Sequence, residues 1–384
     1  MTRLFVSNFG FEIELQGKAI PASVMHSTKG LAECWQPIFE DGDRVLAEDQ
    51  LAGTLSGKGG APPPWLPDTG ISQVIPWGWN HSSAQLARIV GCAADIPDLD
   101  VVKTLNRRRW AWGEAARGLP ALEGADVVSG IDELRDKLAA ATSQGQGWIL
   151  KGDLGMAGRQ QRRGREAVVD DSLGGWAQGR LRIDGVLFVE PWLDALDEFG
   201  VQFHVERNGT FRLCGVTQLL STSDGRYRGT RIRPAGVRGA VEELGTLLSM
   251  LEPVVTRIGE TGYFGPLGID AMLYRDPAGE ARWRPLQDVN ARFTMGRLAL
   301  GWLDRVATTG AATVLQVRWG HTEGVDDRLR DLADEIPGIR QLVRYSPRGP
   351  AVAPAGLILL VVDCERELAP AEARVIEAVE DLGA

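Results

Sequence analysis

The chain has 384 residues, of which 44% are apolar and 24% are charged, a composition typical of a globular protein rather than a disordered one. This length exceeds what one hydrophobic core usually fills, so we expect two or three packed subdomains. The net charge of −9, from 42 Lys and Arg against 51 Asp and Glu, argues against a broad basic surface for nucleic acid.

Membrane spans, secretion signals and zinc sites each leave recognisable patterns in a sequence. The longest apolar run, at residues 356–362, is too short to cross a bilayer. The N-terminus has no apolar stretch typical of a secretion signal, so we expect a cytoplasmic protein with no membrane partner. The four cysteines and four histidines are dispersed, which favours buried free thiols over disulfides and argues against a zinc site.

Residues 1–100 predict a small α/β domain. Short strands are expected at residues 4–7, 44–47 and 72–75, and helices at residues 30–39 and 82–91. Residues 53–58 have glycines and a Gly-Lys pair at the wrong spacing for a phosphate-binding loop, and no G-x-G-x-x-G follows the first strand. We therefore assign no nucleotide site to this domain.

A basic segment and a glycine-rich loop follow. Asn106 is a suitable cap for a helix over residues 106–117, with Arg107 and Arg108 near its start, although a solvated charge run explains these arginines equally well. A strand at residues 148–151 then leads into GDLGMAGRQQRRG (residues 152–164). Glycines let the backbone approach an anion closely, and Lys151 can offer it a positive charge, but such a loop alone is more often a flexible hairpin.

The middle of the chain combines a strand, a hairpin and a second basic segment. A strand at residues 185–190 runs into VEPWL (residues 189–193), and Asn208-Gly209 is a strong hairpin signal. Arginines bind carboxylates and phosphates in a bidentate manner, although solvated charge is the default explanation for such a run. The arginines of this second segment are Arg226, Arg228, Arg231 and Arg233.

Two later strand-like segments carry oxygen ligands. Asp270 lies in the apolar segment 268–274, whereas Asp288 and Asn290 are two residues apart, so their side chains share one face, which Arg292 continues. If the segments pair as a hairpin, three oxygen-bearing side chains converge, and oxygen ligands of this kind suit Mg²⁺. An Asp and an Asn near a strand end also commonly cap turns, so the residues alone favour turn chemistry.

The remaining elements predict scaffold. Residues 239–260 have apolar side chains at helical spacing and are expected to face the core. A helix is expected at residues 295–306. Residues 311–384 predict an α+β tail with strands at 313–318, 342–345 and 356–362 and helices at 326–334 and 369–382.

Four motifs in this order resemble the ATP-grasp superfamily: Lys151 with its glycine-rich loop, the V-E-P-W hinge, the G-I-D strand and the D-x-N-x-R strand. The resemblance covers about residues 106–305. It implies an α/β fold, α+β in places, in four parts. These are an N-terminal α/β pre-ATP-grasp domain (1–100), an ATP-grasp subdomain with the glycine-rich loop (101–190), a second with the metal site (191–310) and a small C-terminal α+β extension (311–384).

The resemblance also implies ATP and Mg²⁺ as cofactors, with Mn²⁺ as an alternative metal. Phosphate ligands would be Lys151, Gly155, Gly158 and either Arg107 or Arg108. The adenine pocket would comprise Glu190, Trp192 and Leu193, and Glu198 is favoured over Asp194 and Asp197 for the ribose. Asp270, Asp288 and Asn290 would hold the metal, and Lys151 and Arg292 would stabilise the charge that develops during catalysis.

The implied reaction is carboxylate–amine ligation. A carboxylate attacks the γ-phosphate to give an acyl phosphate and ADP, and an amine then displaces phosphate. Arg226, Arg228 and Arg231 would face an anionic small molecule such as an amino acid or short peptide, and homo-oligomer formation stays open. The alternatives are an ATP-grasp carboxylase or kinase, or a nucleotide-binding regulatory protein without turnover, because Asp288 stands where the family usually has Glu and an Arg where it has Lys.

Overall fold

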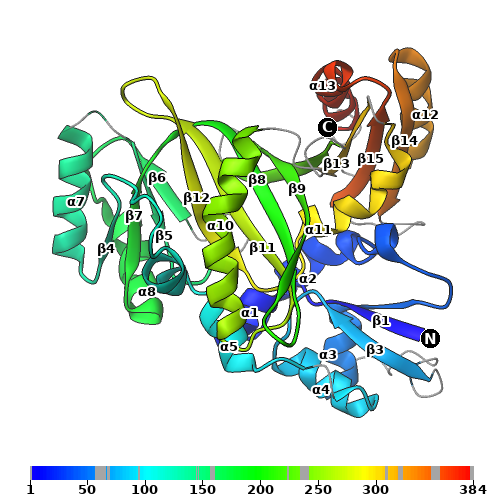
Figure 1. Ribbon diagram of the computed structural model, residues 1–384, viewed down its shortest axis with the longest axis horizontal. Coiled ribbons are helices and arrows are strands. Elements are labelled where there is room, and N and C mark those ends of the chain that lie inside the picture. Colours follow the sequence, from blue (N-terminus) through cyan, green and yellow to red (C-terminus); the bar gives the residue numbers. More distant parts are fainter. Residues whose placement is uncertain are drawn as a thin grey trace.

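The computed structural model describes residues 2–380 except 57–65, 67–69, 94–95, 144, 146, 156–160, 223–224, 234–241, 308–309, 319–322 and 347–354. Its strands form three sheets, each in a different part of the molecule (Figure 1). Helices cover the sheets, so the predicted α/β class is confirmed. None of the described helices is both long enough and apolar enough to cross a membrane.

The N-terminal part is built on a three-stranded parallel sheet with the order β2-β1-β3. Its elements are β1 (Thr2–Ser7), α1 (Phe11–Leu15), α2 (Ala22–Thr28), η1 (Lys29–Leu31), η2 (Gln36–Ile38), β2 (Arg44–Ala47), α3 (Glu48–Ser56), β3 (Ile71–Pro76) and α4 (His81–Ile89). The prediction of one helix over residues 30–39 is wrong. Only the short turns η1 and η2 form there, because Pro37 has no backbone N–H to donate within a helix.

A helical connection leads to the second sheet. It consists of α5 (Leu99–Leu105), α6 (Arg108–Trp110) and the π-helical turn η5 (Ala111–Ala115). Asn106 was expected to begin a helix, and this prediction is wrong: Asp98 caps the start of α5 by accepting from the backbone N–H groups of Asp100 and Val101, and Asn106 ends that helix. The break at Asn106 turns the following arginines in different directions.

The second sheet is antiparallel, with the order β4-β7-β5-β6. This lobe contains β4 (Asp126–Val128), α7 (Ile131–Ser143), β5 (Trp148–Lys151), β6 (Gln161–Gly164), α8 (Asp171–Asp184) and β7 (Leu187–Pro191). Leu134 and Leu138 of α7 and Ala177 of α8 are buried against Leu150 and Val189 of the sheet. Burial of this apolar face fixes the strands that carry Lys151 and Glu190.

The third sheet has eight strands in the order β12-β11-β8-β9-β10-β13-β15-β14. Its first half and the elements that pack on it are β8 (Asp194–Val205), β9 (Phe211–Ser221), β10 (Tyr227–Ile232), α10 (Glu242–Glu260), β11 (Gly265–Arg275), β12 (Ala281–Asn290), α11 (Met295–Ala299) and η6 (Leu300–Arg305). Helix α10 lies across strands β8, β9, β11 and β12 (Figure 1), and its residues Leu247, Leu251 and Val254 are fully buried. The predicted core-facing role of this helix is therefore confirmed.

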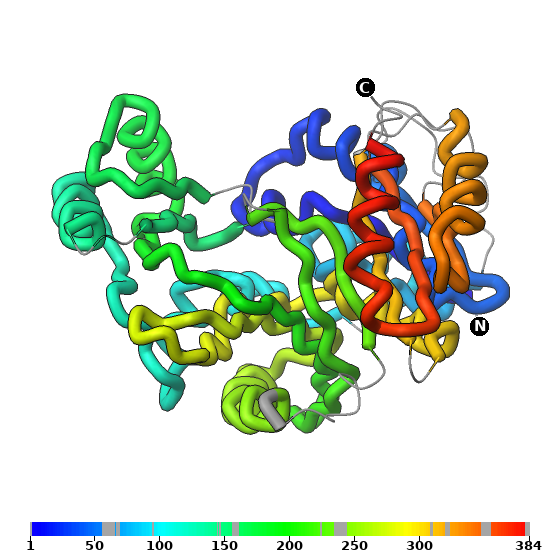
Figure 2. Tube along the Cα trace, turned by 90° about the horizontal axis from the view of Figure 1, so that it is seen from above, coloured from blue at the N-terminus to red at the C-terminus, as the bar shows by residue number. Residues whose placement is uncertain are grey.

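The C-terminal residues continue this same sheet. They form β13 (Ala311–Arg318), α12 (Val325–Glu335), β14 (Ile339–Ser346), β15 (Ala355–Val362), η7 (Glu365–Glu367) and α13 (Leu368–Glu380). Strand β13 pairs antiparallel with β10, so the tail extends the sheet rather than forming one of its own. Figure 2 shows the four-stranded lobe at one end of the molecule and the C-terminal helices at the other.

Candidate active site

A cavity of about 1030 Å³ is lined by residues of the second and third sheets and by residues of the N-terminal part that lie outside its strands. Ligand sites are usually concave and of this order of size, so a nucleotide and a small second molecule would fit. The predicted site residues that line it are Lys151, Gly155, Glu190, Trp192, Leu193, Glu198, Arg231, Asp270, Asp288, Asn290 and Arg292. Arg107, Arg226 and Arg228 are not part of this lining, and Gly158 lies outside the described residues.

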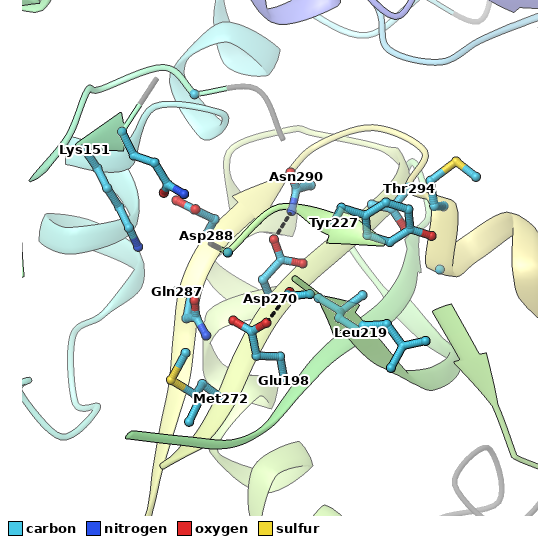
Figure 3. A pocket seen from close by; sticks show the side chains of 18 of the residues that line it. Lys151, Glu198, Leu219, Tyr227, Asp270, Met272, Gln287, Asp288, Asn290 and Thr294 are labelled. Atoms are coloured by element: carbon cyan, nitrogen blue, oxygen red, sulfur yellow. Dashed lines mark hydrogen bonds between the residues drawn. The ribbon is translucent and has the colours of Figure 1, made fainter. Parts of the chain in front are cut away.

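The hairpin of β11 and β12 brings three oxygen-bearing side chains together. Asp270 is paired in register with Asp288, and Gly268 with Asn290. The Asn290 Nδ2 donates to Asp270 Oδ2 at 3.1 Å, and all three side chains lie on the side of the hairpin that faces Lys151 (Figure 3). Burial and the nearby Asp288 charge raise the pKa of Asp270 to about 7. A divalent cation would offset this repulsion, and the all-oxygen donor set fits Mg²⁺.

Asp288 also contacts a buried arginine. The Arg108 Nη2 lies 2.8 Å from Asp288 Oδ1 and donates to Oδ2 at 2.9 Å. A second nitrogen of Arg108 donates to the carbonyl oxygen of Gly152, which ties the guanidinium to the start of the glycine-rich loop. Arg107 instead pairs with Asp153 at 3.1 Å. Of the two arginines that the sequence left open, Arg108 is therefore the one that faces the cavity.

Lys151 and Glu190 form the opposite wall. The Lys151 Nζ lies 2.7 Å from Glu190 Oε2, to which Arg284 Nη1 also donates at 2.9 Å. The Arg284 Nη2 lies 2.9 Å from Oε1. Burial alone would raise the pKa of Glu190, but the charges of Arg284 and Lys151 hold that pKa well below its usual range. Burial lowers the pKa of Lys151, and the Glu190 charge opposes that shift.

One oxygen of Glu190 has no hydrogen-bond donor in the part of the chain that the structure describes. Its residue is only 1% exposed, yet Oε1 has no hydrogen-bond partner among the described residues, since the Arg284 contact to it is an ion pair without hydrogen-bond geometry. A buried acceptor without a donor is costly, so a ligand N–H at this position would be stabilised. Sequence reasoning named Glu190 but missed Arg284. Arg284 precedes Asp288 by four residues on β12, but a register shift lies between them, with Met272 opposite Arg284 and Asp270 opposite Asp288, so simple alternation could not have identified Arg284.

The hinge residues follow Glu190 directly. The Trp192 backbone N–H donates to Gly147 O at 2.7 Å, and the Arg163 guanidinium lies 4.5 Å from the centre of the Trp192 ring. Further along β8, Glu198 accepts from the Ser221 hydroxyl at 2.5 Å. Asp194 and Asp197 also line the cavity, so the structure keeps all three candidate acids on its wall.

The other end of the cavity is formed with the N-terminal part. The Arg292 Nε lies 2.7 Å from Glu12 Oε1, and its guanidinium carbon lies 5.4 Å from the centre of the Trp77 ring. Glu12 is 4% exposed and lines the cavity with Phe9 and Trp77. No local pattern in the sequence indicates Glu12, because its proximity to Arg292 depends on the packing of two distant segments.

Most arginines of the second basic segment serve another contact. Arg231 pairs with Glu372 at 2.5 Å, Arg228 with Glu380 at 2.8 Å and Arg233 with Glu365 at 3.0 Å. All three acids belong to the C-terminal elements η7 and α13. Arg231 also lines the cavity, whereas the Arg226 backbone N–H donates to Thr222 Oγ1 at 3.1 Å. These arginines therefore attach the C-terminal helix to the cavity wall.

Comparison with solved structures defines the class of fold. No protein-family model matches the sequence, and no curated protein matches it. The fold is nevertheless shared with solved carboxyaminoimidazole synthetases and biotin carboxylases, which is the α/β fold that the ATP-grasp resemblance predicts.

Three solved structures illustrate the likeness. N5-carboxyaminoimidazole synthetase from Staphylococcus aureus, complexed with ADP, has a TM-score of 0.57 at 11% identity over 98% of this chain and 97% of the other. Carboxyaminoimidazole ribonucleotide synthase from Aspergillus clavatus, complexed with ATP, has a TM-score of 0.54 at 13% identity over 99% of this chain and 98% of the other. The third structure is the biotin carboxylase domain of the Hydrogenobacter thermophilus 2-oxoglutarate carboxylase, in complex with MgADP, ADP and bicarbonate. Its TM-score is 0.53 at 13% identity over 97% of this chain and 89% of the other.

Proposed function

We propose that this chain is an ATP- and Mg²⁺-dependent ligase that activates a carboxylate as an acyl phosphate and joins it to an amine. The observation that carries this proposal is the meeting of Lys151, Glu190 and the Asp270–Asp288–Asn290 group on one cavity. Solved enzymes of the same fold have been complexed with ATP, ADP and MgADP, which supports a nucleotide in this cavity.

Each end of the cavity has a distinct task in this reaction. Glu190 Oε1 would accept from the adenine amino group, while Lys151 and Arg108 offer positive charge to the phosphates. Asp270, Asp288 and Asn290 would hold Mg²⁺, which neutralises phosphate charge when bound. Positioning and charge stabilisation carry most of a phosphoryl transfer, so no protein nucleophile is required.

The bond changes are balanced without an external oxidant or reductant. A carboxylate oxygen bonds to the γ-phosphorus as the bond from that phosphorus to ADP breaks. The amine nitrogen then bonds to the acyl carbon, inorganic phosphate leaves, and the proton of the amine passes to water. Arg292, which lines the cavity, would stabilise the negative charge on the acyl phosphate.

The substrate end favours an amino acid or a short peptide. Glu12 and Arg292 place a carboxylate and a guanidinium 2.7 Å apart at the cavity wall, beside the aromatic rings of Phe9 and Trp77. A substrate with both an ammonium and a carboxylate group can pair with each of them, and its side chain can contact the rings.

The test is ATP turnover with trapping of the intermediate. ADP release is measured with a panel of amino acids and dipeptides, with and without hydroxylamine, which converts an acyl phosphate to a hydroxamate. Removal of metal with EDTA should stop ADP release, and Mg²⁺ should restore it; Mn²⁺ is tested as the alternative. Substrate-dependent hydroxamate is expected, whereas ATP binding without any substrate-dependent turnover would favour a regulatory nucleotide-binding protein.

The likeness to carboxyaminoimidazole synthetases and a biotin carboxylase favours one second candidate. In that case bicarbonate would be the activated acid. Bicarbonate-dependent ADP release without hydroxamate formation from any organic acid would select this carboxylase function over the ligase.

A further inference from the structure

Glu190 is contacted by two cations that differ in how firmly they are held. Arg284 contacts both carboxylate oxygens: its Nη1 donates a hydrogen bond to Oε2 at 2.9 Å, and its Nη2 forms an ion pair with Oε1 at 2.9 Å. Lys151 reaches only Oε2, at 2.7 Å. A forked guanidinium keeps its geometry on a carboxylate, whereas a lysine ammonium is a point charge on a flexible stem. Lys151 can therefore leave this cluster more easily than Arg284.

Because Glu190 is buried, its carboxylate needs a cationic side chain that stays beside it. Glu190 is 1% exposed, and a buried carboxylate that loses its cationic partner is strongly destabilised. If Lys151 alone paired with Glu190, any anion that drew Lys151 away would leave this charge uncompensated. Arg284 is itself 8% exposed, and its backbone lies within strand β12 opposite Met272, so its side chain starts from a position that the sheet fixes.

The charges of the cluster favour release of the lysine. Lys151 and Arg284 both pair with the single carboxylate of Glu190, whereas Arg108 pairs with Asp288, beside which Asp270 lies. A polyanion entering the cavity can therefore attract a cation without breaking every ion pair on the wall. Arg108 is held by Asp288 and by the Gly152 carbonyl, so the lysine is the mobile member.

On these grounds, and resting on the proposed function, we propose that Arg284 is a positioning residue: it keeps Glu190 compensated and in place so that Lys151 is released to the nucleotide phosphates. Arg284 does not touch the nucleotide in this scheme. Its effect on ATP binding is transmitted through Glu190 and Lys151.

The test is a double-variant comparison of ATP affinity measured by calorimetry. Arg284→Gln should weaken ATP binding on the order of tenfold or more, because Lys151 becomes the sole partner of a buried carboxylate. The second change, Glu190→Gln, removes that carboxylate and keeps an acceptor oxygen. The double variant should therefore bind ATP about as well as Glu190→Gln alone, within about twofold. A merely structural role for Arg284 would not give this rescue.

Two results would overturn the proposal. One is unchanged ATP affinity in Arg284→Gln. The other is a further loss in the double variant relative to Glu190→Gln alone, which would mean that Arg284 contacts the nucleotide directly or only supports the fold. If Arg284→Gln does not fold, the double variant can still be used, because it lacks both charges of the Arg284–Glu190 pair. Its ATP affinity is then compared with that of Glu190→Gln alone. Failure of the unmodified protein to bind ATP would instead reject the proposed function, together with this inference.

Discussion

The two ends of the cavity differ in the sign of their charge. At the end formed by β5, β7 and β12, Lys151, Arg108 and Arg284 outnumber Glu190 and Asp288, and Asp270 beside Asp288 adds an acid whose charge a divalent cation would offset. At the end next to β1, Glu12 pairs with Arg292, and Glu14 and Glu48 lie close behind it. The first end suits a polyanion and the second suits a molecule that carries a positive group. A net charge of −9 for the whole chain conceals this division.

The buried glutamates of the two ends show how the neighbours set the charge state. Glu190 and Glu48 are 1% and 6% exposed. Glu190 faces cations, and its pKa is held low. Glu48 accepts one hydrogen bond, from the Gly10 N–H at 2.7 Å, and its Oε2 has no hydrogen-bond partner within the described part of the chain. Burial and the charges of Glu14, Glu12 and Asp49 raise the pKa of Glu48 to about 7.

The largest effect is expected from the metal group beside the positive end. Asn290→Ala should reduce Mg²⁺-dependent turnover on the order of a thousandfold, because under the proposed function it removes an oxygen ligand of the metal that stabilises transition-state charge. ADP release at saturating ATP measures this. Asn208→Ala, in the turn between β8 and β9, is the matched control and should keep turnover. Unchanged activity of Asn290→Ala would reject the metal assignment.

Glu48→Gln tests the negative end through stability. Because the pKa of Glu48 is raised from 4.5 to about 7 in the folded state, the folded protein binds this proton more tightly than the unfolded chain does. Stability from this group is present below pH 4.5 and is lost as pH rises to about 7. The free energy of unfolding of Glu48→Gln, compared with that of the unmodified protein, should therefore be higher at pH 8 than at pH 4 by up to about 3 kcal/mol.

Urea unfolding at the two pH values measures the Glu48 effect. Glu40→Gln, at an exposed position, is the control and should change little. An equal effect of Glu48→Gln at both pH values would mean that Glu48 has an ordinary pKa.

Lys151→Ala tests whether the positive end of the cavity binds ATP. The fold should persist because Arg284 still compensates Glu190, but ATP should bind about 10- to 100-fold more weakly after loss of a charged phosphate contact. Calorimetric titration with ATP measures this. Lys137→Ala, whose lysine pairs with Asp126 on the outside of the lobe, is the control. Wild-type affinity in Lys151→Ala would remove this lysine from the nucleotide site.

Glu12→Gln should affect binding at the end of the cavity next to β1 and leave ATP binding at the other end nearly unchanged. The KM for the amine substrate is expected to rise about tenfold through loss of one charged contact, while ATP affinity without substrate changes less than about twofold. Steady-state kinetics with the best substrate of the panel, together with ATP titration, measures both. Equal weakening of ATP and substrate would contradict the division of the cavity into two ends.

The smallest effect is expected from Arg228→Ala, outside both ends. Arg228 and Glu380 form a partly exposed pair, which typically contributes about 0–1 kcal/mol. ATP affinity and turnover should not change, and the melting temperature should fall slightly. A large loss of ATP affinity would place Arg228 in the site after all.

The sequence predicted the strands of the site well and their distant partners poorly. Asp288 and Asn290 share a face by the two-residue period of a strand, and their pairing with the segment of Asp270 is local in the chain. Arg108 was not separated from Arg107, because the break at Asn106 decides which of them faces inward. Glu12, and the acids that bind Arg228 and Arg231, come from remote segments, and no local pattern reports such contacts.

The sheet also has a consequence for how the protein is made. Strand β10 contributes Tyr227 and Arg231 to the cavity wall, and its outer edge pairs with β13, which in turn pairs with β15. A nascent chain on the ribosome thus exposes an open strand edge until residues 311–362 have emerged. The cavity wall can be completed only late in translation, and until β13 has joined the sheet β10 has an edge of the kind that pairs with other chains.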